Sequence, residues 1–254
     1  RHYMQHSRKI RYIIAFLLLG ISVLAFVAMN VCIGTVKISL EDIMAAIGGR
    51  EINNSRILWN IRMPRTMAAM ILGGALALAG YLLQTFFHNP IAGPFVLGIS
   101  SGAKMVVALV MVFLMGQAIR VSSVTLIAAA FLGAMISMGF VLLMSHKVNN
   151  MSMLVVSGVM IGYICSAVTE LVVTFANDAE IVNLHNWSRG SFSGMTWDNV
   201  IVMAVVITVT FVIVFFMAKP LSAYQLGESY AQNMGVNIRL LRVALVILSS
   251  ILSA

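Results

Sequence analysis

Long apolar runs separated by short polar stretches dominate the hydrophobic pattern of this chain. A helix of about 20 mostly apolar residues is long enough to cross the hydrocarbon core of a bilayer. The alternating segments typical of a membrane β-barrel do not occur in the sequence. The pattern therefore predicts an all-α, polytopic bundle of transmembrane helices. The expected spans are residues 13–33, 67–86, 95–115, 121–144, 151–175, 200–218 and one beginning near Val243.

Composition agrees with this class, because 61% of the residues are hydrophobic and only 9% are charged. A soluble domain of this composition would lack enough polar residues to cover its surface. The first apolar run is too long for a signal-peptide core and lacks a small-residue cleavage site, which predicts a retained helix. Residues 1–12 then form an amino-terminal arm and residues 13–254 a transmembrane domain. Cys32 and Cys165 lie within apolar runs, where packing is expected rather than a disulfide.

Basic residues give a nearly balanced indication of orientation. The arm before the first span is basic, which places it in the cytoplasm by the positive-inside rule. With alternating loops, however, the outer side also receives many basic residues, chiefly Arg56, Arg62 and Arg65. Such a cluster requires a local partner or a function, and either lipid phosphates or a partner protein would serve.

Small residues form one narrow face of the second predicted span. Gly73, Ala77, Gly80 and Gln84 recur at steps of three and four residues, which predicts a face that packs closely against another helix. Pro64 fits the first turn of this helix, where its missing N–H costs nothing. Because Pro64 marks the start of the helix, Arg62 and Arg65 on either side of it are expected to form a charged pair at the mouth of the span.

The fifth predicted span repeats the small-residue face and adds an acid. Gly158, Gly162, Ser166 and Glu170 follow at four-residue spacing. A carboxylate facing lipid is costly, so Glu170 is expected to point into the protein or into a water-filled path. A structural hydrogen bond and a transport role both fit this position. Lys104, at the start of the third span, is a weaker candidate at the edge of water or a cavity.

Two connecting segments have unusual composition. Residues 87–103, "FHNPIAGPFVLGISSGA", contain prolines and glycines that interrupt helical hydrogen bonding. This segment is expected to form either a tight turn or part of a transport path, because irregular backbone at membrane depth must be buried in protein or line a cavity. Residues 219–242 form the longest polar stretch on the expected cytoplasmic side. Gly227 and Gly235 predict breaks there, with two short helices outside the bilayer and Asn237 as the cap of the next helix. These helices fit either a partner subunit or an interfacial hairpin that covers the bundle.

Other functional classes are less well supported by the residues. A secondary transporter or channel is the main alternative, but its coupling groups would have to come from Glu170 and Lys104, and no inverted repeat is visible. His88, His146 and His185 fall in separate loops and form no ligand or nucleophile–base pattern, so we expect no catalytic residue and no metal site. The sequence also has no G-x-x-x-x-G-K phosphate loop, so any nucleotide that the protein's function requires would have to bind to another polypeptide.

Four segments, taken together and in order, resemble the permease family of iron-siderophore, haem and cobalamin ABC importers. These segments are Arg62-Met-Pro-Arg65 leading into the glycine-rich run, Gln84 with residues 87–103, "NWSRGSFSGMTW" at 186–197 and "LGESYAQNMGVNIRLLR" at 226–242. Permeases of this family have ten transmembrane helices and work in two copies. The chain resembles about the first seven helices. Because it stops at Ala254 inside its last apolar run with no polar flank, we expect a truncation there.

The resemblance implies particular partners and a location. The permease would lie in the bacterial inner membrane with a cytoplasmic amino terminus. It would bind separate ATPase subunits that carry ATP and Mg, a periplasmic or lipid-anchored substrate-binding protein, and a second permease copy as a homodimer or a homologous heterodimer. It would contact lipid and no nucleic acid, and would need no cofactor of its own. The expected cargo is a ferric siderophore, with haem and cobalamin as the other candidates.

The resemblance also implies roles for residues. Arg62 and Arg65 would receive acidic residues of the binding protein. Residues 220–237 would form cytoplasmic coupling helices against the ATPase. The residues that match this coupling segment are Gly227, Glu228 and Gly235, and those near the cytoplasmic gate or the translocation path are Asn89, Pro90, Asn150, Met151, Ser152 and Glu170.

Overall fold

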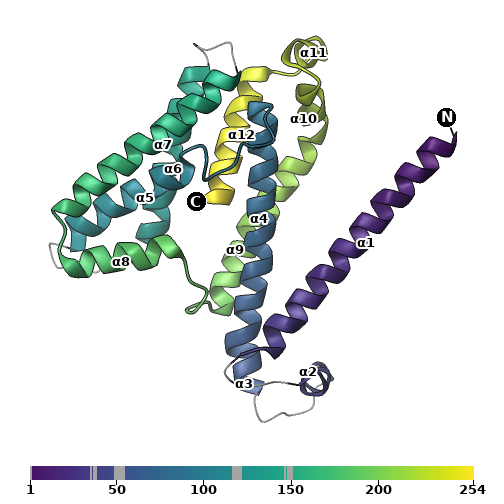
Figure 1. The fold of residues 1–254 in the computed structure, drawn as a ribbon, viewed down its shortest axis with the longest axis vertical. Helices are drawn as coiled ribbons and strands as arrows, with labels where there is room; N and C mark the ends of the chain where they lie inside the picture. The colour runs from purple at the N-terminus through teal and green to yellow at the C-terminus, as the bar shows by residue number, and fades with distance from the viewer. Residues whose placement is uncertain are drawn as a thin grey trace. The chain divides into compact units, whose positions relative to one another are not determined.

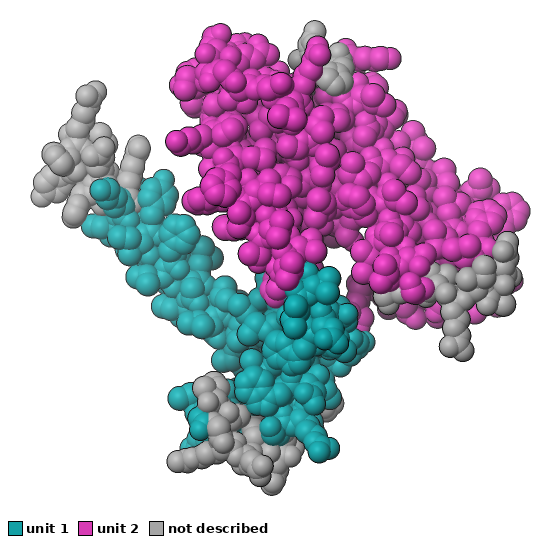
Figure 2. Space-filling view, turned by 180° about the vertical axis from the view of Figure 1, so that it is seen from behind, with its two compact units in different colours: residues 1–70, 192–203 teal, residues 71–191, 204–254 magenta. Residues whose placement is uncertain are grey.

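The computed structural model describes residues 2–34, 36, 39–48, 55–115, 122–145, 147 and 151–254. All regular secondary structure in these ranges is helical, which confirms the predicted all-α class (Figure 1). The chain divides into two compact units, residues 1–70 with 192–203 and residues 71–191 with 204–254 (Figure 2). We describe each unit separately.

Unit 1 contains the amino-terminal helices. They are α1 (His2–Cys32), α2 (Leu40–Ile47), α3 (Ser55–Ile57), the π-helical turn η1 (Leu58–Arg62) and the first turns of α4 (Met63–Phe87). A small core forms where Val31 and Leu58 are buried against Ile43 and Met63. Most of the large apolar side chains of α1 are exposed, as expected for a helix that faces lipid.

Helical backbone begins before the charged pair, so the helical stretch is longer than the predicted span. One apolar helical stretch runs continuously from Ser55 to Phe87, with η1 directly before Pro64. Pro64 does lie in the first turn of α4, as predicted, but helical backbone precedes it. A proline ring crowds the carbonyl four residues earlier and donates no hydrogen bond. The wider π-helical turn relieves this crowding and allows the helix to continue.

Unit 2 contains the remaining helices. They are most of α4, α5 (Ile99–Val110) with η2 (Met111–Met115), α6 (Ser123–Ser145), α7 (Met151–Thr174), α8 (Asp178–Arg189), most of α9 (Trp197–Phe216), α10 (Ala218–Gln225), α11 (Glu228–Asn233) and α12 (Ile238–Ser253). In Figure 1, α5, α6 and α7 lie side by side. The main core is formed by α4, α6, α10 and α12, with Leu82, Phe86, Met138, Tyr224 and Leu245 fully buried.

Each predicted span contains a helix, but several helices have different bounds from the prediction. Among the described residues, five stretches are long and apolar enough to cross a membrane, while α5 and η2 form a shorter one. The third span was predicted from residue 95, yet α5 begins only at Ile99 because Gly98 has a left-handed φ of 78°. The last helix begins at Ile238, directly after the predicted cap Asn237 and before the apolar run that was expected from Val243. Helix α8 was missed, although a capping box of Asn177 and Glu180 marks its start.

The small-residue face of α7 packs as predicted. A Cβ added to Gly98 would come within 2.8 Å of the Gly162 nitrogen and 3.0 Å of the Gly158 oxygen. Helices α5 and α6 approach even more closely, since a Cβ on Gly133 would lie 2.1 Å from the Gly102 oxygen. Glycine is therefore required at these contacts because backbone atoms occupy the space of a side chain.

The small-residue face of α4 is not packed within the described chain, contrary to the prediction. Gly73, Ala77 and Gln84 are exposed, and no atom lies within 4 Å of a Cβ built on Gly80. The buried side of α4 is instead the larger apolar face, with Ala75, Ala79, Leu82, Leu83 and Phe86. Both faces are apolar, so hydrophobic periodicity could not separate them.

A substitution at the α5–α6 contact tests the close approach. We expect Gly133→Ala to lower the apparent melting temperature of the detergent-purified protein, at a cost of roughly 3 kcal/mol, because the clashing atoms are backbone. Gly139→Ala is the matched control on the same helix, since no atom lies within 4 Å of its added Cβ. Equal melting temperatures for the two variants would contradict the observed contact.

Candidate functional site

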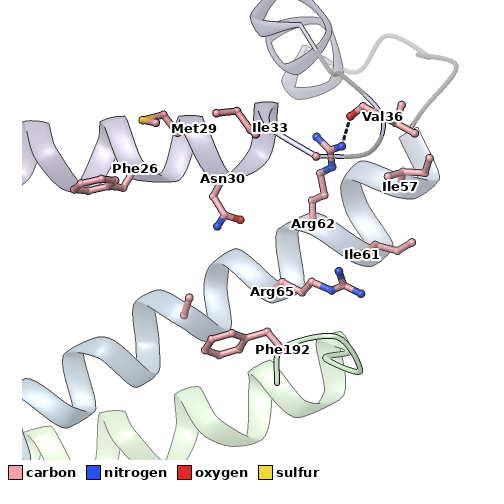
Figure 3. A pocket seen from close by; sticks show the side chains of 12 residues that line it. Phe26, Met29, Asn30, Ile33, Val36, Ile57, Ile61, Arg62, Arg65 and Phe192 are labelled. Carbon is pink, nitrogen blue, oxygen red and sulfur yellow. Dashed lines mark hydrogen bonds between the residues drawn. The ribbon is translucent and has the colours of Figure 1, made fainter. Parts of the chain in front are cut away.

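Arg62 is buried in unit 1, with 8% of its surface exposed. Its guanidinium donates hydrogen bonds to the carbonyl oxygens of Val31, Cys32 and Val36, as the Val36 bond in Figure 3 illustrates. The last carbonyls of a helix lack intrahelical partners. Arg62 therefore caps the carboxyl end of α1 and holds the segment that follows it.

Arg65 is only partly buried and makes a different contact. Its Nη2 donates to the backbone oxygen of Ser193 over 2.7 Å, and Trp197 Nε1 donates to the Trp59 oxygen over 2.8 Å. These bonds attach the segment before α9 to the helix that carries both arginines. The two arginines also line a cavity of about 820 Å³ with mostly apolar walls (Figure 3). A role in docking a partner stays a prediction for both residues.

The predicted pair of short helices is present and is separated by Gly227. Gly227 has a φ of 124° and Gly235, after α11, has a φ of 83°. Both values lie in the region that favours glycine. Asn237 caps α12 as predicted, since its side chain accepts a hydrogen bond from the Leu240 nitrogen. Leu226, Tyr230 and Met234 expose apolar surface on this pair of helices.

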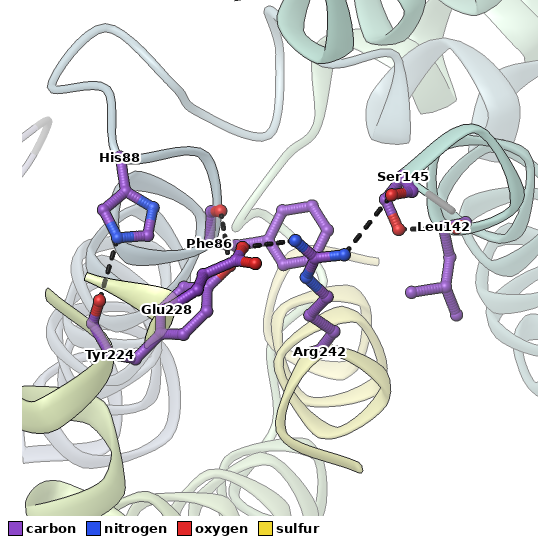
Figure 4. A network of polar contacts seen from close by, with 7 residues as sticks. All are labelled: Phe86, His88, Leu142, Ser145, Tyr224, Glu228 and Arg242. Atoms are coloured by element: carbon purple, nitrogen blue, oxygen red, sulfur yellow. Dashed lines mark hydrogen bonds and ion pairs between the residues drawn. The ribbon is translucent and has the colours of Figure 1, made fainter. Parts of the chain in front are cut away.

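A polar network holds the two short helices in place (Figure 4). Tyr224 is fully buried, and its hydroxyl donates to Glu228 Oε1 at 3.1 Å and lies 3.4 Å from the Phe86 oxygen. Glu228 forms an ion pair with Arg242, whose Nη1 also donates to the Ser145 oxygen at 3.3 Å. Five helices, α4, α6, α10, α11 and α12, thus meet at one cluster. We call Tyr224, Glu228 and Arg242 the hinge cluster.

Further contacts attach α10 to the carboxyl end of α4. His88 Nε2 donates to the Tyr224 oxygen at 2.9 Å, and the two rings lie 4.7 Å apart. Gln225 Nε2 donates to Thr85 Oγ1 at 3.0 Å. Glu228 and Gly227 were predicted from sequence, whereas Tyr224, His88 and Arg242 were missed as partners. No local spacing relates Arg242 to Glu228, so only the tertiary structure brings them together.

Burial raises the pKa of Tyr224 to about 12, which keeps the phenol a neutral donor. Because this pKa exceeds the usual value near 10, the stabilisation is fully present below pH 10 and is lost as the pH rises to about 12. We expect the melting temperature to fall over this range and to fall less in Tyr224→Phe. Thermal unfolding of both proteins between pH 9 and 12, with Tyr12→Phe as an exposed control, measures the difference.

The residues predicted near the gate are only partly described. Asn89 and Pro90 lie in the turn after α4, where Asn89 Oδ1 accepts from the Ile91 nitrogen at 2.9 Å. Met151 and Ser152 begin α7, and Asn150 lies outside the described residues. The described hydrogen bonds of Asn89 stay within its own turn and that end of α4. A gating role stays a prediction.

Glu170 and Lys104 line the same cavity in unit 2, with a volume of about 530 Å³. Arg189, Ser101 and Ser166 also line it, and the two serine oxygens lie 3.5 Å apart. The structure thus places both charges that the sequence singled out in the lining of one cavity. Among the described residues no group of three or more metal-ligating side chains occurs. Cys32 and Cys165 are both free thiols.

The described part of the chain, with five helical stretches long and apolar enough to cross a membrane, has the architecture of a multi-pass membrane protein. The chain belongs to the FecCD transport family, whose sequence signature covers residues 20–254. This assignment confirms the resemblance predicted from the motifs.

Individual relatives agree with this assignment. The vitamin B12 import system permease protein BtuC of Salmonella typhi is 32% identical over 243 residues, which cover 96% of this chain and 71% of the relative. BtuC of Salmonella newport (strain SL254) has the same identity and coverage. An inward-facing structure of an ABC transporter assigned to the metal-chelate type superposes with a TM-score of 0.76. That match has 23% identity and covers 94% of this chain and 74% of the other, so it shows a shared fold.

Proposed function

We propose that this chain is the permease subunit of an ATP-driven importer that moves a metal chelate, with a ferric siderophore as the cargo. The observation that carries this proposal is the FecCD match over residues 20–254, together with the BtuC relatives. Vitamin B12 is itself a metal chelate, so the relatives support this class of cargo. A secondary transporter or channel is not favoured, since the relatives belong to an import system.

ATP hydrolysis is assigned to a separate subunit, because the sequence contains no phosphate-binding loop. Helices α10 and α11 are the proposed contact with that subunit. Their exposed Leu226, Tyr230 and Met234 supply apolar surface of the kind found at protein interfaces. A second permease copy completes the central path, and ATP binding opens the path to one side at a time.

On the outer side, a substrate-binding protein is proposed to dock near the arginine pair. Arg65 is the better candidate for direct contact, because it is only partly buried and Arg62 is occupied by backbone carbonyls. Opposite charges at such a rim speed encounter and fix the docking orientation. The amino terminus then lies in the cytoplasm.

The cavity lined by Glu170 and Lys104 is proposed as part of the translocation path. The charged and hydroxyl side chains in its lining, among them Lys104 and Arg189, support this proposal because a carboxylate within a membrane helix needs polar surroundings. Residues Asn89, Pro90 and 150–152 are proposed to lie near the cytoplasmic gate.

Uptake by proteoliposomes tests this function. The permease is reconstituted with its ATPase subunits and binding protein, and uptake of a radiolabelled ferric siderophore, haem and cobalamin is compared. We expect uptake of one chelate that requires both ATP and the binding protein. Equal uptake without the ATPase subunits would overturn the proposal in favour of a secondary transporter. The ligand that co-purifies with the binding protein identifies the cargo independently.

A further inference from the structure

The hinge cluster gives the two short helices a defined connection to the membrane bundle. Arg242 lies on α12, Glu228 begins α11, and Tyr224 lies near the end of α10. We propose that Arg242 is a positioning residue that fixes α10 and α11 to α12, α6 and α4, so that these helices move together during transport. This inference rests on the proposed function, because it assigns the path by which ATPase motion reaches the bundle.

Arg242 joins two helices that are distant in sequence. One guanidinium nitrogen, Nη2, bonds Glu228, while Nη1 donates to the Ser145 oxygen at 3.3 Å. Ser145 is the last residue of α6, where the helix leaves its final carbonyls without intrahelical partners. A planar guanidinium can serve both acceptors at once because its donors point in fixed, separate directions. Lysine has a single nitrogen and cannot reproduce this geometry.

Tyr224 extends the connection to α4. Its hydroxyl donates to the same carboxylate oxygen that pairs with Arg242, at 3.1 Å. Its backbone oxygen accepts from His88 just beyond α4, and its ring is fully buried against Phe86 and neighbouring apolar side chains. A displacement of α11 therefore pulls on Arg242 through Glu228 and on α4 through Tyr224.

The ion pair between Glu228 and Arg242 is partly buried, so it can hold α11 against α12. The exposed fractions of the two side chains are 13% for Arg242 and 33% for Glu228. Salt screens a partly buried pair less than an exposed one. Removing one partner leaves the other charge partly desolvated and unpaired, which favours local rearrangement of the short helices. Buried Leu221, Tyr224 and Ala231 already pack the two short helices against the bundle, and the ion pair adds a directional bond from α11 to α12.

Arg242→Gln in the complete transporter tests the proposal. Its matched control is Arg239→Gln, an exposed arginine on the same helix. Both are assayed in proteoliposomes for ATPase co-purification, ATPase rate and cargo imported per ATP hydrolysed. We expect Arg242→Gln to co-purify with the ATPase and hydrolyse ATP while importing about tenfold less cargo per ATP, within the usual range of coupling between sites. Arg239→Gln is expected to match the wild type.

Two further variants separate positioning from general stability. The exchanged pair Glu228→Arg with Arg242→Glu should recover a large part of the import lost in either single variant, and Arg242→Lys should be intermediate. If Arg242→Gln does not fold, the exchanged pair and Arg242→Lys still test the proposal. Unchanged import per ATP in Arg242→Gln, or an exchanged pair no better than the single variants, would overturn the inference. Wild-type protein without ATP-dependent uptake would instead overturn the proposed function.

Discussion

Replacing Arg62 with glutamine is expected to leave little folded permease, whereas the same change at Arg65 is expected to preserve folding. Arg62 satisfies three backbone carbonyls in a buried position. A buried polar group left without its partner costs about 1–3 kcal/mol, so losing this cap costs roughly 3 kcal/mol or more. Arg65 gives up one described hydrogen bond, to Ser193, and is less buried.

The measurement separates folding from docking. Detergent-solubilised variants are compared by size-exclusion chromatography and melting temperature, and binding-protein affinity is then measured at several salt concentrations. Arg65→Gln should remain monodisperse and bind the binding protein more weakly, with a smaller dependence on salt. Arg56→Gln, an exposed arginine in the same helical stretch, is the control for a general loss of charge.

Two outcomes would contradict this division of roles. A well-folded Arg62→Gln with normal melting temperature would show that the carbonyl contacts are not needed for folding. Unchanged affinity and unchanged salt dependence in Arg65→Gln would remove Arg65 from the docking surface.

Gly227→Ala is expected to uncouple the permease from its ATPase. Gly227 has φ 124° and ψ 147°, a region that essentially only glycine occupies. Forcing a side chain into such a conformation costs about 1–3 kcal/mol even where space is open, as it is here. The backbone is expected to relax by changing the angle between α10 and α11, which misplaces the surface proposed to meet the ATPase.

Gly235→Asn provides the matched control after α11. Gly235 has φ 83°, a left-handed value that asparagine tolerates better than other non-glycine residues. We expect Gly227→Ala to reduce ATPase co-purification and ATP-dependent uptake about tenfold, in line with its strain cost. Gly235→Asn should retain most of both activities. Equal behaviour of the two variants would argue against a special role for the turn at Gly227.

Much of the fold was predictable because its main signals are local. Apolar run length identifies the membrane helices, and glycine and asparagine marked the ends of α10, α11 and α12. The combination of motifs was also sufficient to recognise the family that the comparison then confirmed. These features can be read from short continuous segments, because bilayer thickness sets the length of an apolar run and single residues such as glycine set the local backbone conformation.

Contacts between distant segments were not predictable in the same way. The sequence by itself determined that Arg62 and Glu228 are unusual charges beside apolar helices. Only the tertiary structure decided that Arg62 caps α1 and that Glu228 pairs with Arg242. It also decided which apolar face of α4 is buried, because two faces of one helix were similarly apolar. Periodicity shows which residues share a face, whereas the partner of that face depends on how the whole chain packs.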